Sequence, residues 1–201
     1  MQARPRTSLA TTVTGGRAVR PSSEEIDERI LDVAAGVFAQ FGYAQASVQQ
    51  IADETGYSKT GLLHRFGSKE QLRDAVRESC LAAFADAIGS PRTRKPGPAR
   101  DREIVTALVD LAMVRPGFIA LLLSGMTELT ADDTAWVHHE ARALVDVGFG
   151  MDDATPLSRQ IRVIGCLATL GVGVGVTATR EFPAHEVRVE LEAACRAVLG
   201  V

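Results

Sequence analysis

The stretch at residues 47–69, SVQQIADETGYSKTGLLHRFGSK, constrains the fold of this 201-residue chain more than any other part. Ser47 stands three residues before Gln50, the spacing at which two such side chains cap the start of a helix reciprocally. Gly56 can take the left-handed conformation that ends such a helix, and Ser58 can cap the next one. The spacing therefore predicts two short helices joined by a tight turn, a helix-turn-helix.

The second of these helices is expected to have one buried face and one free face. Leu62 and Phe66 lie four residues apart, so they share a face and hold the helix against its neighbour. The free face carries Lys59 and Thr60 near the helix start, where a helix-turn-helix contacts base edges in the major groove. Lys59 can donate to a guanine edge, and Thr60 can bond a base or touch a thymine methyl. The same corner also occurs in helical proteins that have no DNA role.

Other groups around this helix suit the DNA backbone, because hydroxyls, cations and helix N-termini bind phosphates. Ser47 and Lys69 are of this kind, and Gly61 permits close approach of the backbone. The residues expected to contact DNA are Ser47, Gln49, Ser58, Lys59, Thr60, Gly61, Leu63, His64, Arg65 and Lys69.

Together with the helix before it, this stretch resembles the DNA-binding domain of TetR-family (TetR/AcrR) transcriptional regulators. The resemblance spans residues 22–88 and is carried by Phe38, Gly42, Ile51, Ala52, Gly56, Ser58, Leu62, Phe66, Ser68, Lys69, Glu70 and Leu72. It implies an all-helical homodimer, most often a repressor, whose C-terminal domain binds a small molecule that releases it from a palindromic operator.

Two positions depart from the pattern of that family. Leu63 stands where the family usually has a Tyr whose hydroxyl reaches a phosphate, so Leu63 either packs or meets a thymine methyl. Arg65 stands where the family usually has a His, and it can replace that contact with a permanent charge. His64 is expected to contact a phosphate rather than to act as a pH switch.

Composition favours an all-α protein. Hydrophobic residues make up 46% of the chain but aromatic residues only 5%, and no strand-like alternation of apolar and polar residues appears. About nine helices are expected, in an N-terminal three-helix helix-turn-helix domain and a C-terminal helical ligand-binding and dimerisation domain. The first helix should start at the capping pair Ser22 and Glu25 and end at Gly42.

Four parts are expected along the chain. Residues 1–21 contain arginines but no acid and should be a disordered basic arm, either an inert tail or an arm along DNA phosphates or the minor groove. Residues 22–88 form the helix-turn-helix domain with its connecting helix, and the proline-rich residues 89–100 form a linker. Residues 101–201 form the ligand-binding and dimerisation domain, with helices at about 101–115, 118–126, 132–147, 157–179 and 184–199.

The charge of the chain is unevenly distributed. Residues 1–100 carry 14 Lys and Arg against 11 Asp and Glu, a net charge of +3, whereas residues 101–201 carry 8 against 14, a net charge of -6. The basic part is thus the part expected to bind DNA. The three cysteines, Cys80, Cys166 and Cys195, are widely spaced and suit reduced core positions. With no apolar core of a signal peptide at residues 1–21, a cytoplasmic protein is expected.

The last two expected helices suit a dimer interface. Residues 163–179 carry no charge, but their Gly and Thr content favours a packed helix over a membrane span. In TetR-family regulators the last two helices pair with their two-fold mates as a four-helix bundle, and small and apolar residues here fit that arrangement. The expected interface residues are Ala168, Gly171, Val172, Gly175, Val187, Leu191, Ala194 and Val198.

Known catalytic and metal-binding motifs fail in this chain. The pair His139-Glu140 lacks the second histidine of a zinc-protease helix, because residue 143 is Ala. No enzyme activity, metal or cofactor is therefore expected, and the C-terminal domain is expected to bind a ligand. The residues expected to line an apolar pocket, each of which also suits ordinary core packing, are Met113, Phe118, Leu122, Met126, Trp136, Phe149, Cys166 and Leu170.

The sequence thus predicts a ligand-responsive regulator that binds a palindromic operator as a homodimer and is released by a small apolar or amphipathic molecule. Its partners would be double-stranded DNA, the small molecule and a second copy of the chain, without a membrane. The alternative is a helical protein-interaction module that keeps the fold without sequence-specific DNA binding.

Overall fold

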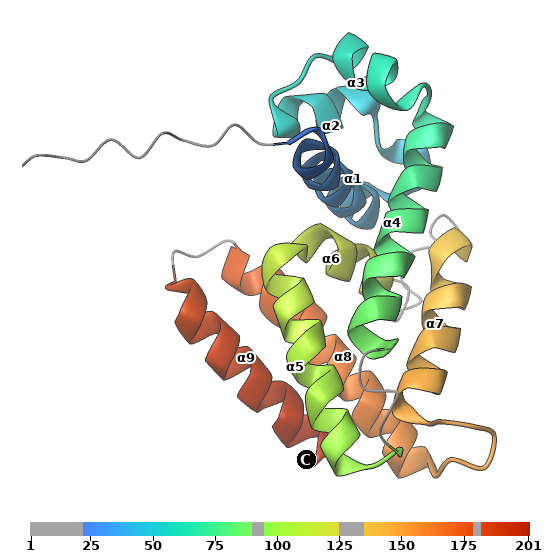
Figure 1. The fold of residues 1–201 in the computed structure, drawn as a ribbon, viewed down its shortest axis with the longest axis vertical. Coiled ribbons are helices and arrows are strands. Elements are labelled where there is room, and N and C mark those ends of the chain that lie inside the picture. Colours follow the sequence, from blue (N-terminus) through green and yellow to red (C-terminus); the bar gives the residue numbers. More distant parts are fainter. Residues whose placement is uncertain (1–21, 90–94, 125–134, 179–181) are drawn as a thin grey trace, which may run out of the picture.

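The computed structural model describes residues 22–89, 95–124, 135–178 and 182–201 (Figure 1). Within these ranges every regular element is a helix, which confirms the predicted all-α class. Residues 1–21, expected to form a basic arm, lie outside the described residues. The helices in the described ranges are α1 (Ser23–Gln45), α2 (Val48–Thr55), α3 (Lys59–Phe66), α4 (Lys69–Gly89), α5 (Pro98–Val114), α6 (Pro116–Ser124), α7 (Ala135–Phe149), α8 (Leu157–Ala178) and α9 (Ala184–Leu199).

Figure 1 shows α1, α2, α3 and the start of α4 gathered at one end of the molecule. We call this part the head, residues 22–76. Helix α4 runs from the head into the C-terminal domain, where it packs against α5 and α7. Its buried residues recur at helical spacing and form one continuous core stripe, namely Leu72, Val76, Cys80, Phe84 and Ile88.

The capping pairs predicted for the head are present. Ser22 and Glu25 form a reciprocal capping box at the start of α1, and Ser47 and Gln50 form another at the start of α2. Gly56 ends α2 in the left-handed conformation, with a φ of 75°. The helix-turn-helix therefore forms from the signals that predicted it.

Two predicted boundaries are wrong by a few residues. Gly42 breaks the helical geometry of α1 with a φ of 72°, but helix continues from there to Gln45 instead of ending. The range predicted for a linker, residues 89–100, overlaps helix at both ends, because α4 includes Gly89 and α5 starts at Pro98. Pro98 occupies the first turn of α5, where its missing N–H costs no hydrogen bond.

Helix α6 joins the C-terminal domain to the head. It follows α5 after a bend of 115°, at the predicted break near Pro116 and Gly117, and it packs against α1. The backbones are so close that a Cβ added at Gly117 would overlap the carbonyl oxygen of Asp32. The backbone N–H of Phe118 donates to Oδ1 of Asp32 at 3.0 Å, and Arg115 forms an ion pair with Glu28. The head and the C-terminal domain thus meet in a close polar joint.

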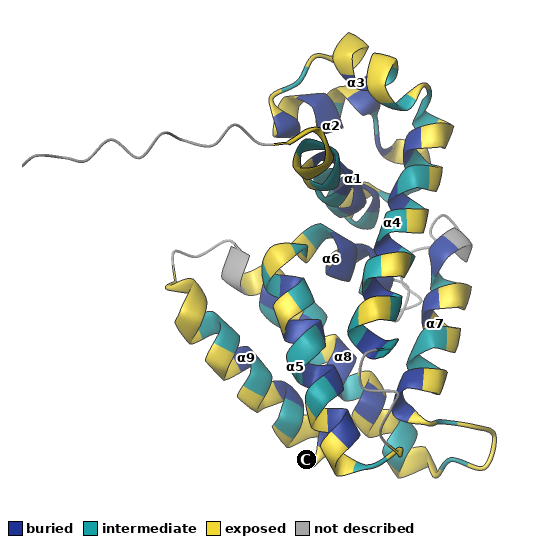
Figure 2. Ribbon diagram, viewed as in Figure 1, coloured by how far each residue is buried: buried dark blue, intermediate teal, exposed yellow. Residues whose placement is uncertain are grey.

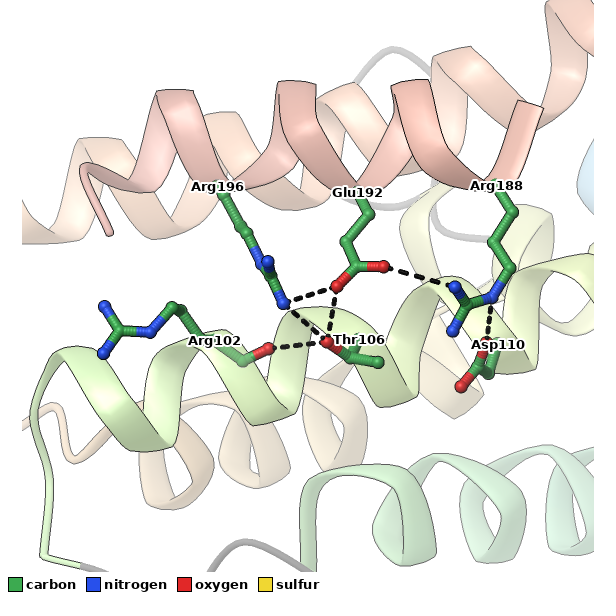
Figure 3. A network of polar contacts seen from close by, with 6 residues as sticks. All are labelled: Arg102, Thr106, Asp110, Arg188, Glu192 and Arg196. Atoms are coloured by element: carbon green, nitrogen blue, oxygen red, sulfur yellow. Dashed lines mark hydrogen bonds and ion pairs between the residues drawn. The ribbon is translucent and has the colours of Figure 1, made fainter. Parts of the chain in front are cut away.

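Helices α8 and α9 pack along each other, and two glycines of α8 allow the close approach. A Cβ at Gly165 would lie 3.0 Å from Val198, and one at Gly173 would collide with Leu191. Residues along α9 also bind α5 through a network of polar contacts (Figure 3). In it, Arg188 donates to Asp110 at 2.7 Å, and the Thr106 hydroxyl donates to Glu192 at 2.7 Å.

A buried ion pair holds the start of α8 to the start of α5. Arg159 donates to both carboxylate oxygens of Asp101, at 2.6 and 2.9 Å, and to the carbonyl oxygen of Phe149 at 3.0 Å. The Asp101 side chain is only 1% exposed. A charge this well buried depends on its partner.

Among the described residues, one helix is long and apolar enough to cross a membrane, at residues 157–176 of α8. The core helix of a soluble protein can be equally long and apolar. Only 22% of this stretch is buried within the chain, so much of its apolar surface faces outward.

Candidate nucleic-acid interface and C-terminal cavity

Helix α3 presents its first half to solvent at the outer end of the head (Figure 2). Leu62 is 1% exposed and anchors the helix in the core, whereas Lys59, Thr60 and His64 are exposed. The side chains expected to reach base edges therefore stand together on an outer surface. This is the geometry that a helix needs in order to enter a major groove.

The residues expected to contact the DNA backbone lie around this helix. The hydroxyl of Ser58 accepts the backbone N–H of Gly61 at 3.0 Å, and that of Ser47 accepts the backbone N–H of Gln50 at 3.1 Å. Each hydroxyl keeps its own proton to donate to a phosphate. Gln49 is exposed and donates to Asp53 at 2.8 Å. Both short helices thus start next to groups that suit phosphates.

Leu63 packs against the core and is partly buried. Of the two alternatives open for this residue, packing or contact with a thymine methyl, the structure favours packing.

Arg65 has its guanidinium engaged within the head. Its Nε forms an ion pair with Asp27, and its Nη2 donates to the carbonyl and hydroxyl oxygens of Ser23, each at 2.7 Å. The bond to Asp27 raises the pKa of Arg65. These contacts tie the end of α3 to the start of α1 and so fix the direction of α3. A phosphate contact by Arg65 stays a prediction.

A cluster around Tyr43 was not predicted from the sequence. The ammonium group of Lys69 lies 4.4 Å from the centre of the Tyr43 ring and donates to the carbonyl oxygen of Ala44 at 3.3 Å, and the guanidinium of Arg73 lies 5.0 Å from the same ring. The Tyr43 hydroxyl donates to Glu70 at 3.1 Å. Burial, followed by the bond to Glu70, raises the pKa of Tyr43. The ring contacts two cations that lie four residues apart at the start of α4. That spacing places both cations on one face of the helix and was the signal in the sequence for this cluster.

The C-terminal domain contains a cavity of about 630 Å³, a volume typical of small-molecule sites. Four helices, α4, α6, α7 and α8, and the turn between α7 and α8 contribute to its wall. The lining residues are Phe84, Leu122, Leu123, His138, Ala141, Arg142, Val145, Asp146, Met151, Asp152, Asp153, Gln160, Ile164 and Leu167.

His138 is a polar group in the wall that sequence reasoning left unassigned. Its Nε2 lies 3.2 Å from the carbonyl oxygen of Leu121 and 3.3 Å from the hydroxyl of Ser124. The carbonyl can only accept, so Nε2 carries the proton and donates. Burial lowers the pKa of His138, which keeps the ring neutral near neutral pH.

Comparison with known proteins places the head in a family. Residues 30–76 match the model described as bacterial regulatory proteins, tetR family. The transcriptional regulator RutR of Escherichia coli K12 is 30% identical over 143 residues, which are 67% of this chain and 66% of RutR. This chain belongs to the TetR family. It spans just under two thirds of the length of RutR.

Two further comparisons extend this assignment. The transcriptional repressor AcnR of Corynebacterium efficiens is 32% identical over 78 residues, 39% of each protein. A solved TetR-family regulator from Bordetella parapertussis is 18% identical, with a TM-score of 0.60 over 88% of this chain and 95% of that one. The second likeness shows that the TetR-family fold extends through the C-terminal domain. The relatives named here are regulators, which confirms that a TetR-family regulator, and not an enzyme, was the correct expectation.

In this TetR-family chain, the residues expected to line a pocket fall into three groups. Leu122 lies in the cavity wall. Met113 is partly buried against the core, and Met126 and the side chain of Trp136 lie outside the described residues. The remaining four are buried core residues outside the wall of this cavity, namely Phe118, Phe149, Cys166 and Leu170.

Some residues expected at a dimer interface contact their own chain, and others are exposed. Gly171 faces Leu123 of α6, and Leu191 is buried against Gly173, so both contact their own chain. Val187 is partly buried. The other expected residues are exposed on α8 and α9, namely Ala168, Val172, Gly175, Ala194 and Val198. On α8, Ala168 and Val172 belong to an apolar stripe at helical spacing that comprises Leu157, Ile161, Ile164, Ala168, Val172 and Val176.

Proposed function

We propose that this protein is a transcriptional repressor that binds a palindromic operator as a homodimer and leaves it when a small apolar or amphipathic molecule enters the C-terminal domain. The observation that carries the proposal is the placement of α3. Leu62 anchors the helix while Lys59 and Thr60 in its first half, and His64 in its last turn, face outward. AcnR, which is 32% identical to this chain over 78 residues, is itself named a repressor.

The contacts divide into those that read bases and those that position the protein. Lys59 and Thr60 would reach base edges, with Gly61 allowing close approach. Ser47, Ser58 and Lys69 would bind phosphates, and Gln49 and His64 would add contacts to the backbone. The ring of Tyr43 holds Lys69 in place by a cation–π contact. The Lys69 ammonium is therefore preorganised for a phosphate.

The apolar stripe on α8 supports the homodimer. Val172 is 67% exposed and Ile161 58% exposed, although large apolar patches are uncommon on monomers. A second copy that covers this stripe across a two-fold axis would bury it. The same axis would set the two copies of α3 about 34 Å apart, in successive major grooves.

Helix α6 offers the route from the cavity to the head. Its Leu122 and Leu123 line the cavity, while its first turn binds Asp32 of α1 through the backbone N–H of Phe118. A ligand that displaces α6 would therefore strain the joint with α1 and change the spacing of the two α3 helices. The ligand must bind the released state more tightly than the DNA-bound state for this to release DNA.

Selection of the purified protein on a random pool of duplex DNA, at two salt concentrations, tests the proposal. Recovery of an inverted repeat with half-sites about one helical turn apart is expected. The alternative, a protein-interaction module, predicts that a folded dimer enriches no sequence.

Two variants separate base reading from backbone binding. Lys59→Ala should weaken specific DNA binding by about 1–3 kcal/mol and relax the preference at one base pair. Lys69→Ala should weaken binding to all DNA sequences alike and make the affinity less dependent on salt. Glu78→Gln is the matched control, since this exposed α4 residue lies outside the proposed interface. Wild-type affinity and selectivity in both lysine variants would contradict the placement of α3 in the groove.

A further inference from the structure

The wall of the cavity among α4, α6, α7 and α8 combines apolar and acidic side chains. Phe84 and Leu123 form part of the apolar wall, whereas Asp146 near the end of α7, and Asp152 and Asp153 in the following turn, bring carboxylates to it. Figure 1 shows this α7–α8 turn at the far end of the C-terminal domain from α6. A molecule in the cavity would therefore meet two different surfaces.

The charges in the wall do not cancel. Three carboxylates face one guanidinium, that of Arg142. Arg142 lies 3.9 Å from Asp146, and its side chain is 73% exposed, so it offsets one carboxylate at most. The partly buried His138 adds no charge near neutral pH, because this partial burial lowers its pKa. The described wall thus carries a formal charge of -2.

The two carboxylates of the turn have different surroundings. Oδ1 of Asp152 accepts the backbone N–H of Ala154 and the hydroxyl of Thr155, each at 3.0 Å. Asp152 therefore stabilises the turn. Asp153, the next residue, is exposed and lines the cavity. It is the carboxylate best placed to meet a ligand without disturbing the turn.

We propose that this cavity binds a lipophilic cation, an apolar body that carries one positive head group. The apolar body would lie against Phe84 and Leu123, with the head group beside Asp146 and Asp153. Apolar burial favours any body of suitable size, and the carboxylates select the sign of its charge. The inference deepens the proposed function, and its effect on DNA release rests on that function.

Two probes of nearly equal shape and opposite charge test the proposal, tetraphenylphosphonium and tetraphenylborate. Isothermal titration calorimetry on the full chain without DNA should show that the phosphonium binds at least about tenfold more tightly, since the carboxylates attract one ion and repel the other. Added salt should narrow this preference by screening the charges. Equal affinity, a preference for the borate, or no binding of either ion would overturn the proposal.

Variants in the turn place the preference at this site. Asp153→Asn should lower the affinity for the phosphonium about threefold or more, and Asp153→Lys should abolish or reverse the preference for the phosphonium over the borate. Glu78→Gln removes an exposed carboxylate outside the cavity wall and should change neither affinity. Unchanged selectivity in Asp153→Lys would overturn the assignment of the head group.

A third variant tests the apolar wall. Ala141 lies in the wall and is 5% exposed. Ala141→Phe should therefore fill part of the cavity and lower the affinity for both ions. If circular dichroism shows that this variant is unfolded, Val145→Asn, at a less buried wall position outside the α8 stripe, replaces it with the same expectation. Unchanged affinities in a folded variant would overturn the assignment of the cavity.

The binding test and the DNA test fail separately. If DNA selection succeeds and the phosphonium shows no preference over the borate, the inference is wrong and the proposed regulator stands. If the phosphonium binds as expected but leaves operator affinity unchanged, the cavity assignment stands and the proposed ligand response is wrong.

Discussion

The head and the C-terminal domain hold their helices in place by different means. In the head, the hydroxyls of Ser22, Ser47, Ser58 and Ser68 each accept a backbone N–H three residues further on, at 3.0–3.2 Å. Each bond satisfies an N–H that the helix itself leaves free. The starts of these four helices are therefore specified within a few residues of sequence.

Two helices of the C-terminal domain, α5 and α9, start without such caps. Neither Gly97 before α5 nor Pro183 before α9 makes a side-chain cap bond. Contacts between distant residues join the helices instead, as in the pair of Arg159 with Asp101 and the network of α5 with α9 (Figure 3). The order of this domain depends on how whole helices pack.

Two of the four capped helices of the head are also short. Helices α2 and α3 have eight residues each, and helices shorter than about 12–15 residues are marginal without added support. Local caps supply that support in the head. Helices α8 and α9, with 22 and 16 residues, pack along each other instead. The comparison indicates a head whose helix starts are set by local hydrogen bonds and a C-terminal domain whose order comes from packing between helices.

The largest expected effect comes from the buried ion pair of the C-terminal domain. Arg159→Ala leaves the Asp101 carboxylate buried at 1% exposure without its partner. Breaking such a pair costs about 3–5 kcal/mol, so urea unfolding should show a loss of this size.

The control for this variant is an exposed pair in the same domain. Arg142→Ala removes a guanidinium that is 73% exposed and 3.9 Å from Asp146, and it should cost less than about 1 kcal/mol. Equal losses in the two variants would mean that burial does not set the value of ion pairs in this domain.

The sequence predicted the head well because its signals are local. The pairs Ser22–Glu25 and Ser47–Gln50 act over three residues, and Gly56 acts at a single position, so a reader of the sequence meets cause and effect together. The errors in the head were also local. Gly42 has the positive φ expected of a helix end, but nothing in the sequence indicated that helix would resume after it.

The residues of the cavity wall could not be predicted, because no local signal in the sequence places them there. Phe118, Phe149, Cys166 and Leu170 are apolar residues on helical faces, like Leu122, but the packing of four helices decides which of them line space and which fill it. Asp152 and Asp153 were placed in a loop, and no local pattern connects a loop to a cavity formed with α4 and α6. Gly171 likewise packs against its own chain, and not at the predicted dimer interface, because of where Leu123 lies.

The joint between the two regions should show the next largest effect. At Gly117→Ala the new Cβ would overlap the backbone of Asp32, and such overpacking costs about 1–3 kcal/mol. Gly36→Ala is the matched control, because its Cβ would make an ordinary contact of 3.7 Å with Gly117. Thermal unfolding measures the cost. A destabilisation by Gly36→Ala as large as that by Gly117→Ala would show that the contact at Gly117 does not set the joint.

A smaller effect should follow from loss of one local cap. Ser47→Ala removes the acceptor for the N–H of Gln50 and should destabilise the head by about 1 kcal/mol. Ser158→Ala, at an exposed serine in α8, should change stability by less than about 0.5 kcal/mol. Hydrogen exchange of α2 amides, compared with α8 amides, locates the change. Faster exchange throughout the chain in Ser47→Ala would contradict a local role for the cap.

The smallest expected effect is a pH dependence confined to the C-terminal domain. Burial lowers the pKa of His138 from its usual 6.5, so the unfolded chain takes up a proton at a higher pH than the folded chain. The contribution of His138 to stability is therefore complete above pH 6.5 and is lost as the pH falls from there through the folded pKa. His138→Gln should remove this part of the pH dependence, measured by urea unfolding between pH 5 and 7.5.

His139→Gln changes the adjacent, exposed histidine and should keep the wild-type dependence. Because the head contains no buried histidine among its described residues, α2 amides should show the same local stability at both ends of this pH range in wild type and in His138→Gln. An equal loss of pH dependence in the two histidine variants would mean that exposure, and not burial beside α6, controls the titration.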